Sequence, residues 1–145
     1  MNKKESFFQF TNPKISEILF APTGESVSSK LKDVLDTIQV KSDVSRDSEK
    51  NIATVTLTVS NFDKDDLDND NAISLPYLIR IGYTAEFHWD NSDVHNIDMF
   101  LNINAPALLL GYIRPQISEI TSRAGFEPLY LPFLDFTDEQ NSDKK

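Results

Sequence analysis

The 145-residue chain contains no cysteine and only four glycines, and these two shortages exclude several classes of protein. Without cysteine, the chain forms neither a disulfide framework nor a thiolate metal site. The sequence also lacks a glycine-rich phosphate loop, a dinucleotide fingerprint and the Gly-x-Ser-x-Gly elbow of many hydrolases. We therefore expect a protein that is not an enzyme and that needs no cofactor. A pair of carboxylates brought together by folding stays open as a catalytic alternative.

Basic residues are scarce as well, with 14 Lys and Arg against 23 Asp and Glu and a formal net charge of −9. Nucleic-acid phosphates demand a basic surface, so this balance argues against nucleic-acid binding. It is compatible with a basic partner, or with a chaperone-like role in which charge keeps a sticky surface in solution. The chain has no apolar run long enough to cross a membrane and no signal-peptide pattern, which predicts a soluble cytoplasmic protein.

An acidic loop at residues 63–71 resembles a calcium site only in part. From Asp66 onward, the first, third and fifth positions are aspartate, as an EF-hand loop requires. The sixth position is Asn71 where the motif needs glycine, and the twelfth is Tyr77 where it needs glutamate. A solvated hairpin loop is therefore the favoured interpretation. The two histidines are too few for a zinc site, and His88 is expected at the surface, so we predict no metal.

Four segments have strand patterns. The strongest is residues 52–60, where apolar residues alternate with threonine. Residues 74–90 are apolar at every odd position, and residues 36–45 alternate in the same way. Residues 7–21 read as an extended segment that is interrupted at residues 12–13, where a proline indicates a strand edge or a bulge.

One long helix is predicted for residues 104–123, because apolar residues recur there at helical spacing. Asn104 is a suitable N-cap, and Gly125 can take the left-handed conformation that ends a helix. We expect Pro115 to bend the helix without breaking it, because the residue four positions earlier is glycine. The segment that follows, residues 126–136, is apolar but too rich in proline for a helix.

Strands that precede a single helix predict an α+β fold. The expected architecture is a four-stranded antiparallel sheet with one long helix packed on one face and a short C-terminal segment. Residues 1–136 are expected to form one domain, and residues 137–145 a polar, disordered tail.

The chain has ten Phe, four Tyr and one Trp, more than a four-stranded sheet beneath one helix is expected to bury. Irregular, proline-flanked segments usually run over surfaces, and apolar residues there indicate partner binding. The residues predicted to form a groove for unfolded polypeptide are Phe20, Leu31, Leu35, Tyr130, Leu131, Phe133 and Phe136. The alternative for each of them is a place in an aromatic core.

The predicted helix is apolar over more than one stripe, whereas packing on one sheet requires only one. The wider apolar surface suggests a second subunit. The residues predicted for this oligomer interface are Leu108, Tyr112, Ile113, Ile117 and Ile120.

The helix and the segment after it resemble the bacterial export chaperone family SecB. That family has a helix core of the form Pro-Asn-x-Leu-Phe-Pro-Tyr-x-Arg, then Arg-Gly-x-Phe-x-x-Leu-x-Leu and a short x-Asn-Phe end. The positions that match, in order, are Pro106, Leu109, Tyr112, Arg114, Arg123, Phe126, Leu129, Leu131 and Phe136. The departures are Ala107, Leu110, Gly111, Pro115 and Asp135, with Gly125 one position late.

The resemblance implies an ATP-independent holdase that binds non-native polypeptides in apolar grooves and forms a homotetramer, a dimer of dimers. It also implies possible delivery of clients to the SecA motor. The family's docking surface includes acidic residues on the sheet, but here Arg80 stands where one is expected and Glu17 is only nearby. Two alternatives stay open: an adaptor dedicated to one partner, such as an antitoxin, a phage protein or a host protein, and an oligomeric scaffold that does not chaperone.

Overall fold

The computed structural model describes residues 8–24, 31–47, 49–63, 75–90 and 96–137. Its strands precede its long helix in the chain, as the sequence predicts. The elements are β1 (Phe8–Phe10), β2 (Lys14–Pro22), α1 (Leu31–Asp36), β3 (Gln39–Asp47), β4 (Ile52–Ser60), β5 (Tyr77–Trp89), α2 (Ile97–Met99), a π-helical turn η3 (Phe100–Asn104) and α3 (Ala105–Arg123).

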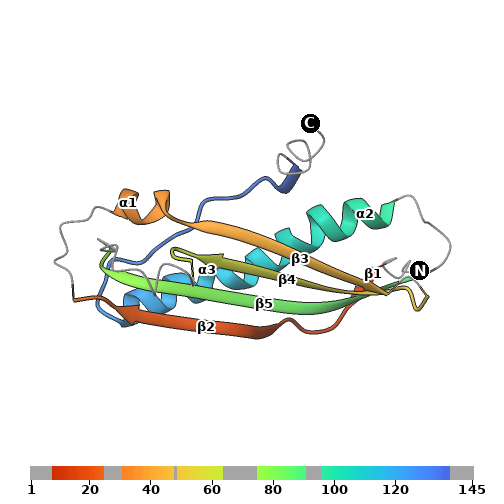
Figure 1. Ribbon diagram of the computed structural model, residues 1–145, viewed down its shortest axis with the longest axis horizontal. Coiled ribbons are helices and arrows are strands. Elements are labelled where there is room, and N and C mark those ends of the chain that lie inside the picture. Colours follow the sequence, from red (N-terminus) through yellow and green to blue (C-terminus); the bar gives the residue numbers. More distant parts are fainter. Residues whose placement is uncertain (1–7, 25–30, 48, 64–74, 91–95, 138–145) are drawn as a thin grey trace, which may run out of the picture.

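The strands form one antiparallel sheet in the order β1-β5-β4-β3, with β2 also paired to β5. β1 pairs with the end of β5 and β2 with its beginning, so β1 and β2 share one edge (Figure 1). The chain leaves the sheet between them at Asn12 and Pro13, where the expected interruption falls. The sheet is thus four strands wide, and the predicted α+β class is confirmed.

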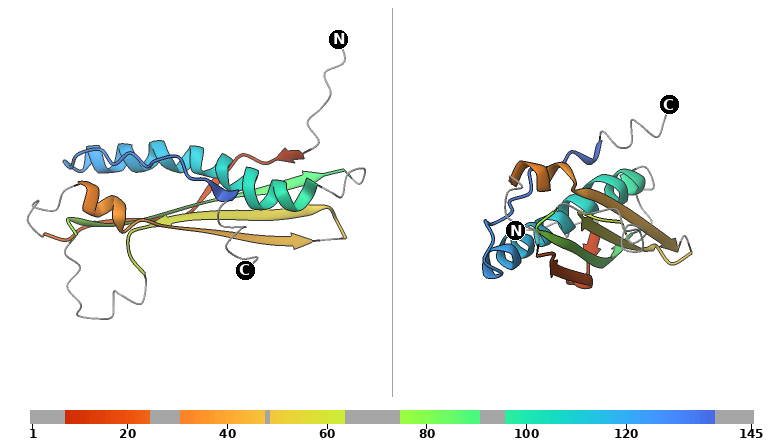
Figure 2. Two further views of the ribbon diagram at one scale, coloured as in Figure 1. Left: turned by 90° about the horizontal axis from the view of Figure 1, so that it is seen from above. Right: turned by 60° about the vertical axis from the view of Figure 1, so that its left-hand side comes forward.

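One face of the sheet is apolar and carries the helix. The odd-numbered residues of β5 are all buried, and so are the alternate apolar residues of β4. α3 packs against both strands and forms a second layer over this face (Figures 1 and 2). Residues at the centre of the core, with no exposed surface, are Val55, Leu57, Val59, Ile79, Ile81, Phe87, Leu109, Ile113 and Ile117.

The helix begins earlier than predicted. Asn104 has helical angles (φ −74°, ψ −41°) and its side chain makes no capping hydrogen bond, so it is not the N-cap. The buried stripe continues backward at intervals of four residues through Leu101 to Ile97. This stripe keeps α2, η3 and α3 on the sheet as one helix. The wide turn of η3 ends two residues before Pro106, whose missing N–H interrupts the α-helical hydrogen bonds.

The helix continues past Pro115, as expected, and ends at Arg123. Gly125 has a positive φ of 93°, and Phe126 N–H donates to the Thr121 carbonyl at 3.0 Å. Gly125 N–H donates to Ser122 at 3.1 Å, which completes the capping motif predicted for this glycine. No described helix is both long and apolar enough to span a membrane. Of the predicted tail, only Thr137 lies within the described residues, so the boundary at 136 stays a prediction.

Candidate functional site

After Gly125 the chain turns back over α3 as a segment without regular structure up to Asp135, and we call residues 126–136 the strap (Figure 2). Two hydrogen bonds of 3.0 Å hold it there. Leu129 N–H donates to the Thr121 hydroxyl, and Arg114 Nε donates to the Leu131 carbonyl. The Arg114 guanidinium also lies over the Phe133 ring, 4.2 Å from its centroid. The strap is therefore fixed along one side of the helix.

The strap divides its apolar side chains between the core and the solvent. Leu129, Leu131 and Phe136 are buried, whereas Tyr130 is 68% and Phe133 87% exposed. We predicted that Leu131 and Phe136 lie in a surface groove, and the structure places both in the core instead. Inward and outward side chains alternate from Leu129 to Pro132, but the alternation ends there, because Phe133 is exposed as well. Tyr130 and Phe133 are the predicted groove residues that face solvent.

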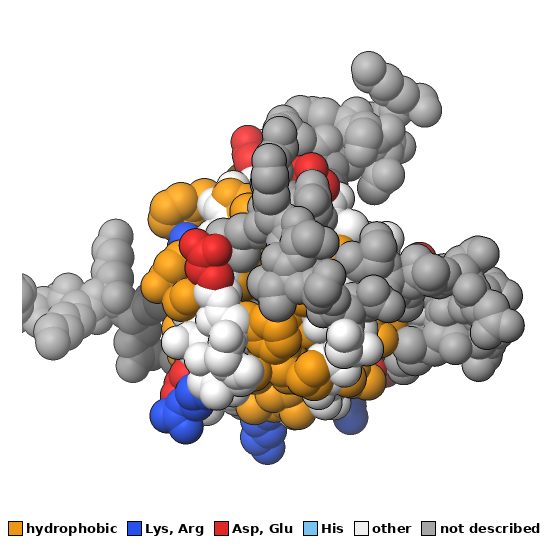
Figure 3. Space-filling view, turned by 90° about the vertical axis from the view of Figure 1, so that its left-hand side faces the viewer, with side chains coloured by type: hydrophobic (Ala, Val, Ile, Leu, Met, Phe, Trp, Pro, Cys, Tyr) orange, Lys and Arg blue, Asp and Glu red, His pale blue; other side chains and the backbone are white. Residues whose placement is uncertain are grey.

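An aromatic cluster lies where the strap begins. The Tyr77 ring is 5.2 Å from Phe20 and 4.9 Å from Phe126, measured between centroids. Three distant parts of the sequence thus meet at one end of the sheet. The surface at this end shows apolar side chains gathered at its centre, with charged groups around them (Figure 3). Phe20 is half-buried there, so part of its ring stays accessible.

The remaining groove residues lie in α1. Leu35 is half-buried and packs against the core beside Val34, which is 2% exposed. The side chain of Leu31 lies outside the described part of the structure. The predicted groove as a whole stays a prediction.

The Tyr77 hydroxyl is buried and has no hydrogen-bond partner among the described residues. Burial raises the pKa of Tyr77 from 10.0 to about 12. Replacement of Tyr77 by phenylalanine is expected to stabilise the fold by about 1 kcal/mol at pH 7, because an unpaired buried hydroxyl is costly.

Tyr77→Phe is also expected to lose less stability than the wild type when the pH rises above 10. Above pH 10 the unfolded chain of the wild type releases the Tyr77 proton while the folded chain keeps it, so unfolding is favoured until about pH 12. Urea titrations at pH 8 and pH 11 measure both effects. Tyr130→Phe, at an exposed hydroxyl, is the control. Equal shifts in the two variants would show that Tyr77 finds a partner.

The residues predicted for the oligomer interface also divide between the core and the surface. Ile113 and Ile117 have no exposed surface within the single chain, so their assignment to an interface was wrong. They face the sheet and form the core. Leu108 and Ile120 are half-buried and Tyr112 is 43% exposed, so these three reach the surface.

The sequence patterns missed part of this surface, at the neighbouring edge of the sheet. Ile15 and Ile18 are 47% and 48% exposed, and both face the side on which the helix lies, opposite Tyr83 and Ile81. Residues three apart in a regular strand point to opposite faces. Here the register shifts at Ser16, and the bulge places both isoleucines on the same face. A strand pattern read from sequence does not reveal such a shift.

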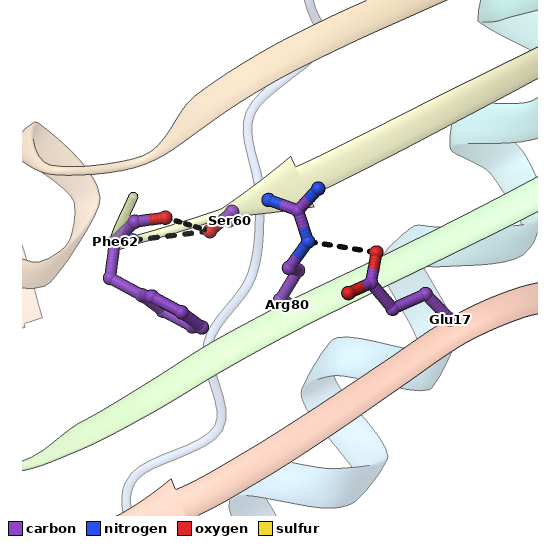
Figure 4. Close-up of polar contacts among 4 residues, drawn as sticks. All are labelled: Glu17, Ser60, Phe62 and Arg80. Carbon is purple, nitrogen blue, oxygen red and sulfur yellow. Dashed lines mark hydrogen bonds and ion pairs between the residues drawn. The ribbon is translucent and has the colours of Figure 1, made fainter. Parts of the chain in front are cut away.

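The opposite face of the sheet is polar. Arg80 reaches from β5 to Glu17 on β2, with Nε 2.8 Å from a carboxylate oxygen (Figure 4). The strand register places three basic and four acidic residues on this outer face. They are Lys14, Lys41, Arg80, Glu17, Asp43, Asp47 and Glu86. The described part of this face is thus almost neutral, although the chain carries −9.

The sites considered for metals do not come together in the described residues. The described residues contain no cluster of three or more His, Asp or Glu side chains that could hold a metal ion. His88 lies on the outer face, with Nε2 2.8 Å from Glu86. Most of the acidic loop, residues 64–74, lies outside the described residues, and so does His95.

The antiparallel sheet with its polar outer face, the long helix on the other face and the apolar strap over that helix define an α+β class of fold. The family described as preprotein translocase subunit SecB matches residues 32–142, and the chain belongs to that family.

Curated relatives match a shorter stretch. The protein-export protein SecB of Roseobacter denitrificans is 33% identical over 60 residues, covering 41% of this chain and 36% of the relative. That of Anaplasma phagocytophilum is 49% identical over 64 residues, covering 42% and 40%. The matches therefore span well under half of these relatives.

A solved structure supports the fold over nearly the whole chain. A SecB-like chaperone from Mycobacterium tuberculosis, in complex with a peptide from an antitoxin, superposes with a TM-score of 0.61. The match covers 89% of this chain and 92% of the other, at 13% sequence identity. At that identity the likeness shows a shared fold.

Proposed function

We propose that this protein is a cytoplasmic chaperone that holds non-native polypeptides without using a nucleotide. The observation that carries the proposal is the strap, which exposes Tyr130 and Phe133 on a segment that is hydrogen-bonded to α3. Exposed aromatic side chains provide apolar contact that does not depend on one client sequence. Membership of the SecB family supports the same role.

We also propose that the protein binds further copies of itself and forms a homotetramer, a dimer of dimers. The surface proposed for this contact combines Leu108 and Tyr112 on α3 with Ile15 and Ile18 on β2. Tyr112 lies 6.0 Å from Tyr83, between ring centroids, so the helix and the sheet meet at this surface. An exposed apolar area that continues across two elements is typical of subunit contacts.

Delivery of clients to the SecA motor has less support than chaperoning itself. The family resemblance leads us to expect an acidic outer sheet face, but Arg80 and Glu17 form an ion pair there. This pair favours the alternative in which the protein is an adaptor for one dedicated partner. The antitoxin peptide bound by the chaperone from M. tuberculosis is a precedent in that other protein.

Light scattering of two unrelated denatured proteins, diluted with and without this chain and without ATP, tests the proposal. Protection of both at near-stoichiometric amounts is the result expected of a general holdase. Protection of only one client would favour the dedicated adaptor. If neither client is protected, the general holdase is excluded.

A strap variant connects this activity to the candidate site. Tyr130→Asp combined with Phe133→Asp is expected to raise the amount of chaperone needed for half-maximal protection about tenfold, through the loss of two apolar contacts. The melting temperature should stay close to that of the wild type, because both side chains are exposed. Met99→Asp, at a 55% exposed position on α2, is the control and should protect normally. Equal protection by the wild type and both variants would mean that clients bind elsewhere on the protein.

A further inference from the structure

A hollow of about 250 Å³ lies on the outer face of the sheet, where the chain passes from β1 to β2. This volume is smaller than that of most ligand and cofactor pockets. A water molecule takes up only about 30 Å³ in the liquid, so the hollow has room for one side chain of a partner. The residues that line it include Thr11, Asn12, Lys14, Thr54, Thr84 and Glu86.

The groups in this hollow that are open to a ligand are mainly donors. Of the residues that line it, only Glu86 is acidic, and its carboxylate lies 2.8 Å from Nε2 of His88. The Lys14 amine and the Thr54 hydroxyl have no hydrogen-bond or ion-pair partner among the described residues, and both residues are exposed. An ammonium group only donates, and a hydroxyl can donate, so the hollow suits an acceptor with negative charge.

The rest of the outer face has the same imbalance. Three of its four acidic residues already have a partner within the chain, and Asp43 is the exception in the part that the structure describes. Lys41 has no partner there either, and Arg80 uses only its Nε, for Glu17. The two terminal nitrogens of Arg80 extend toward β4 (Figure 4). Donors without a partner therefore outnumber carboxylates without one on this face.

The spacing of these donors fits a short segment of polypeptide. Lys14 lies opposite Thr84, which is four residues along β5 from Arg80, a separation of about 13 Å in a strand. An extended segment whose acidic side chains alternate covers this distance with three of them. Nucleic acids and anionic membranes carry charge over much longer distances, and a chain of net charge −9 repels them as a whole.

We propose that the outer face binds an acidic segment of a partner protein, with one carboxylate in the hollow beside Lys14 and Thr54, and another at the terminal nitrogens of Arg80. The chemistry is opposite in sign to the acidic docking surface that the family resemblance implies. The site lies on the other face of the sheet from the strap. It is therefore independent of the proposed chaperone function.

An NMR titration of the isotope-labelled protein with the peptide Gly-Glu-Ser-Glu-Ser-Glu-Gly tests the proposal, beside a twin peptide in which each glutamate is glutamine. The acidic peptide is expected to shift the amide signals of Thr54 and Thr84 and to bind at least about tenfold more tightly than its twin. Lys14→Gln should weaken binding about fivefold. Lys50→Gln, which removes the same charge from the exposed β3–β4 turn, should weaken it less than about twofold.

Equal affinity of the two peptides would overturn the inference, because such binding needs no carboxylate. Equal weakening by the two lysine variants would also overturn it, since only net charge would then matter. Shifts confined to the strap would mean that the peptide binds as a client, and they too would reject the site.

The aggregation assay separates this inference from the proposed function. Lys14→Gln should protect clients as well as the wild type does, because the hollow and the strap lie on opposite faces. A wild type that binds the acidic peptide but protects no client would reject the chaperone role and leave the outer site standing. Protection of clients without binding of the acidic peptide would give the reverse conclusion.

Discussion

Replacement of Ile117 by aspartate is expected to unfold the chain, whereas replacement of Tyr112 by aspartate is expected to leave it folded. Ile117 has no exposed surface and lies in the core between α3 and the sheet. A carboxylate there would lose its hydration, so we expect a loss of more than about 4 kcal/mol, comparable with the whole stability of many domains. Tyr112 is 43% exposed, and a charge there stays hydrated.

Circular dichroism and light scattering distinguish the two outcomes. Ile117→Asp should lose its cooperative thermal transition. Tyr112→Asp should keep the transition but elute with a smaller mass, because a charge in the proposed subunit contact opposes association. A folded Ile117→Asp protein would show that the helix is not packed as described. An unchanged mass for Tyr112→Asp would move the subunit contact away from this face of α3.

These two residues also show how far the sequence predicts the fold. The apolar residues alternate along β4 and β5 and recur every four residues along α3, and these are the buried positions, so these three elements were predicted correctly apart from the start of the helix. The sequence does not show how much of the helix surface the sheet covers. Ile117 and Tyr112 both belong to an apolar surface, and only the packing separates the core from the exposed part.

Local signals misplaced the start of the helix. Asn104 followed by a proline two residues later is a typical capping pattern, yet Asn104 is itself helical. The buried residues Ile97 and Leu101 continue the stripe and were the better signal. Burial along the whole helix stabilises it more than one cap does, so the longer helix forms.

The candidate site was predicted only in outline. The apolar, proline-rich composition of residues 126–136 correctly indicates an extended segment at the surface. Which side chains turn inward depends on anchors outside the segment, namely Thr121 and Arg114, because their bonds fix the orientation of the strap. Sequence patterns therefore could not separate Leu131 from Phe133.

Asn61 is the second position where we expect a large effect, since its side chain continues the sheet beyond the end of β4. Its Nδ2 donates to the Tyr77 carbonyl at 2.9 Å, and its Oδ1 accepts from Ile79 N–H at 2.9 Å. The side-chain amide thus takes the place of a peptide group opposite β5. Asn61 is only 5% exposed, so water is poorly placed to replace these bonds.

Asn61→Ala is expected to destabilise the fold by about 2–5 kcal/mol, because it leaves a buried carbonyl and a buried N–H without partners. Urea denaturation measures the loss, and Asn102→Ala is the control. Asn102 donates to the Asp98 carbonyl at an exposed position, so its removal should cost less than about 1 kcal/mol. Similar losses in the two variants would contradict the role assigned to Asn61.

Asn61→Asp refines the test through its dependence on pH. One carboxylate oxygen can still accept from Ile79 N–H, but the other would face the Tyr77 carbonyl, and two acceptors repel. The folded state therefore favours the protonated acid, which raises the pKa of the new carboxyl above its unfolded value. Stability relative to the wild type should fall as the pH rises above about 4 and recover on acidification. A deficit that stays constant from pH 4 to pH 7 would mean that this carboxyl is hydrated, and that the chain around residue 61 opens to solvent.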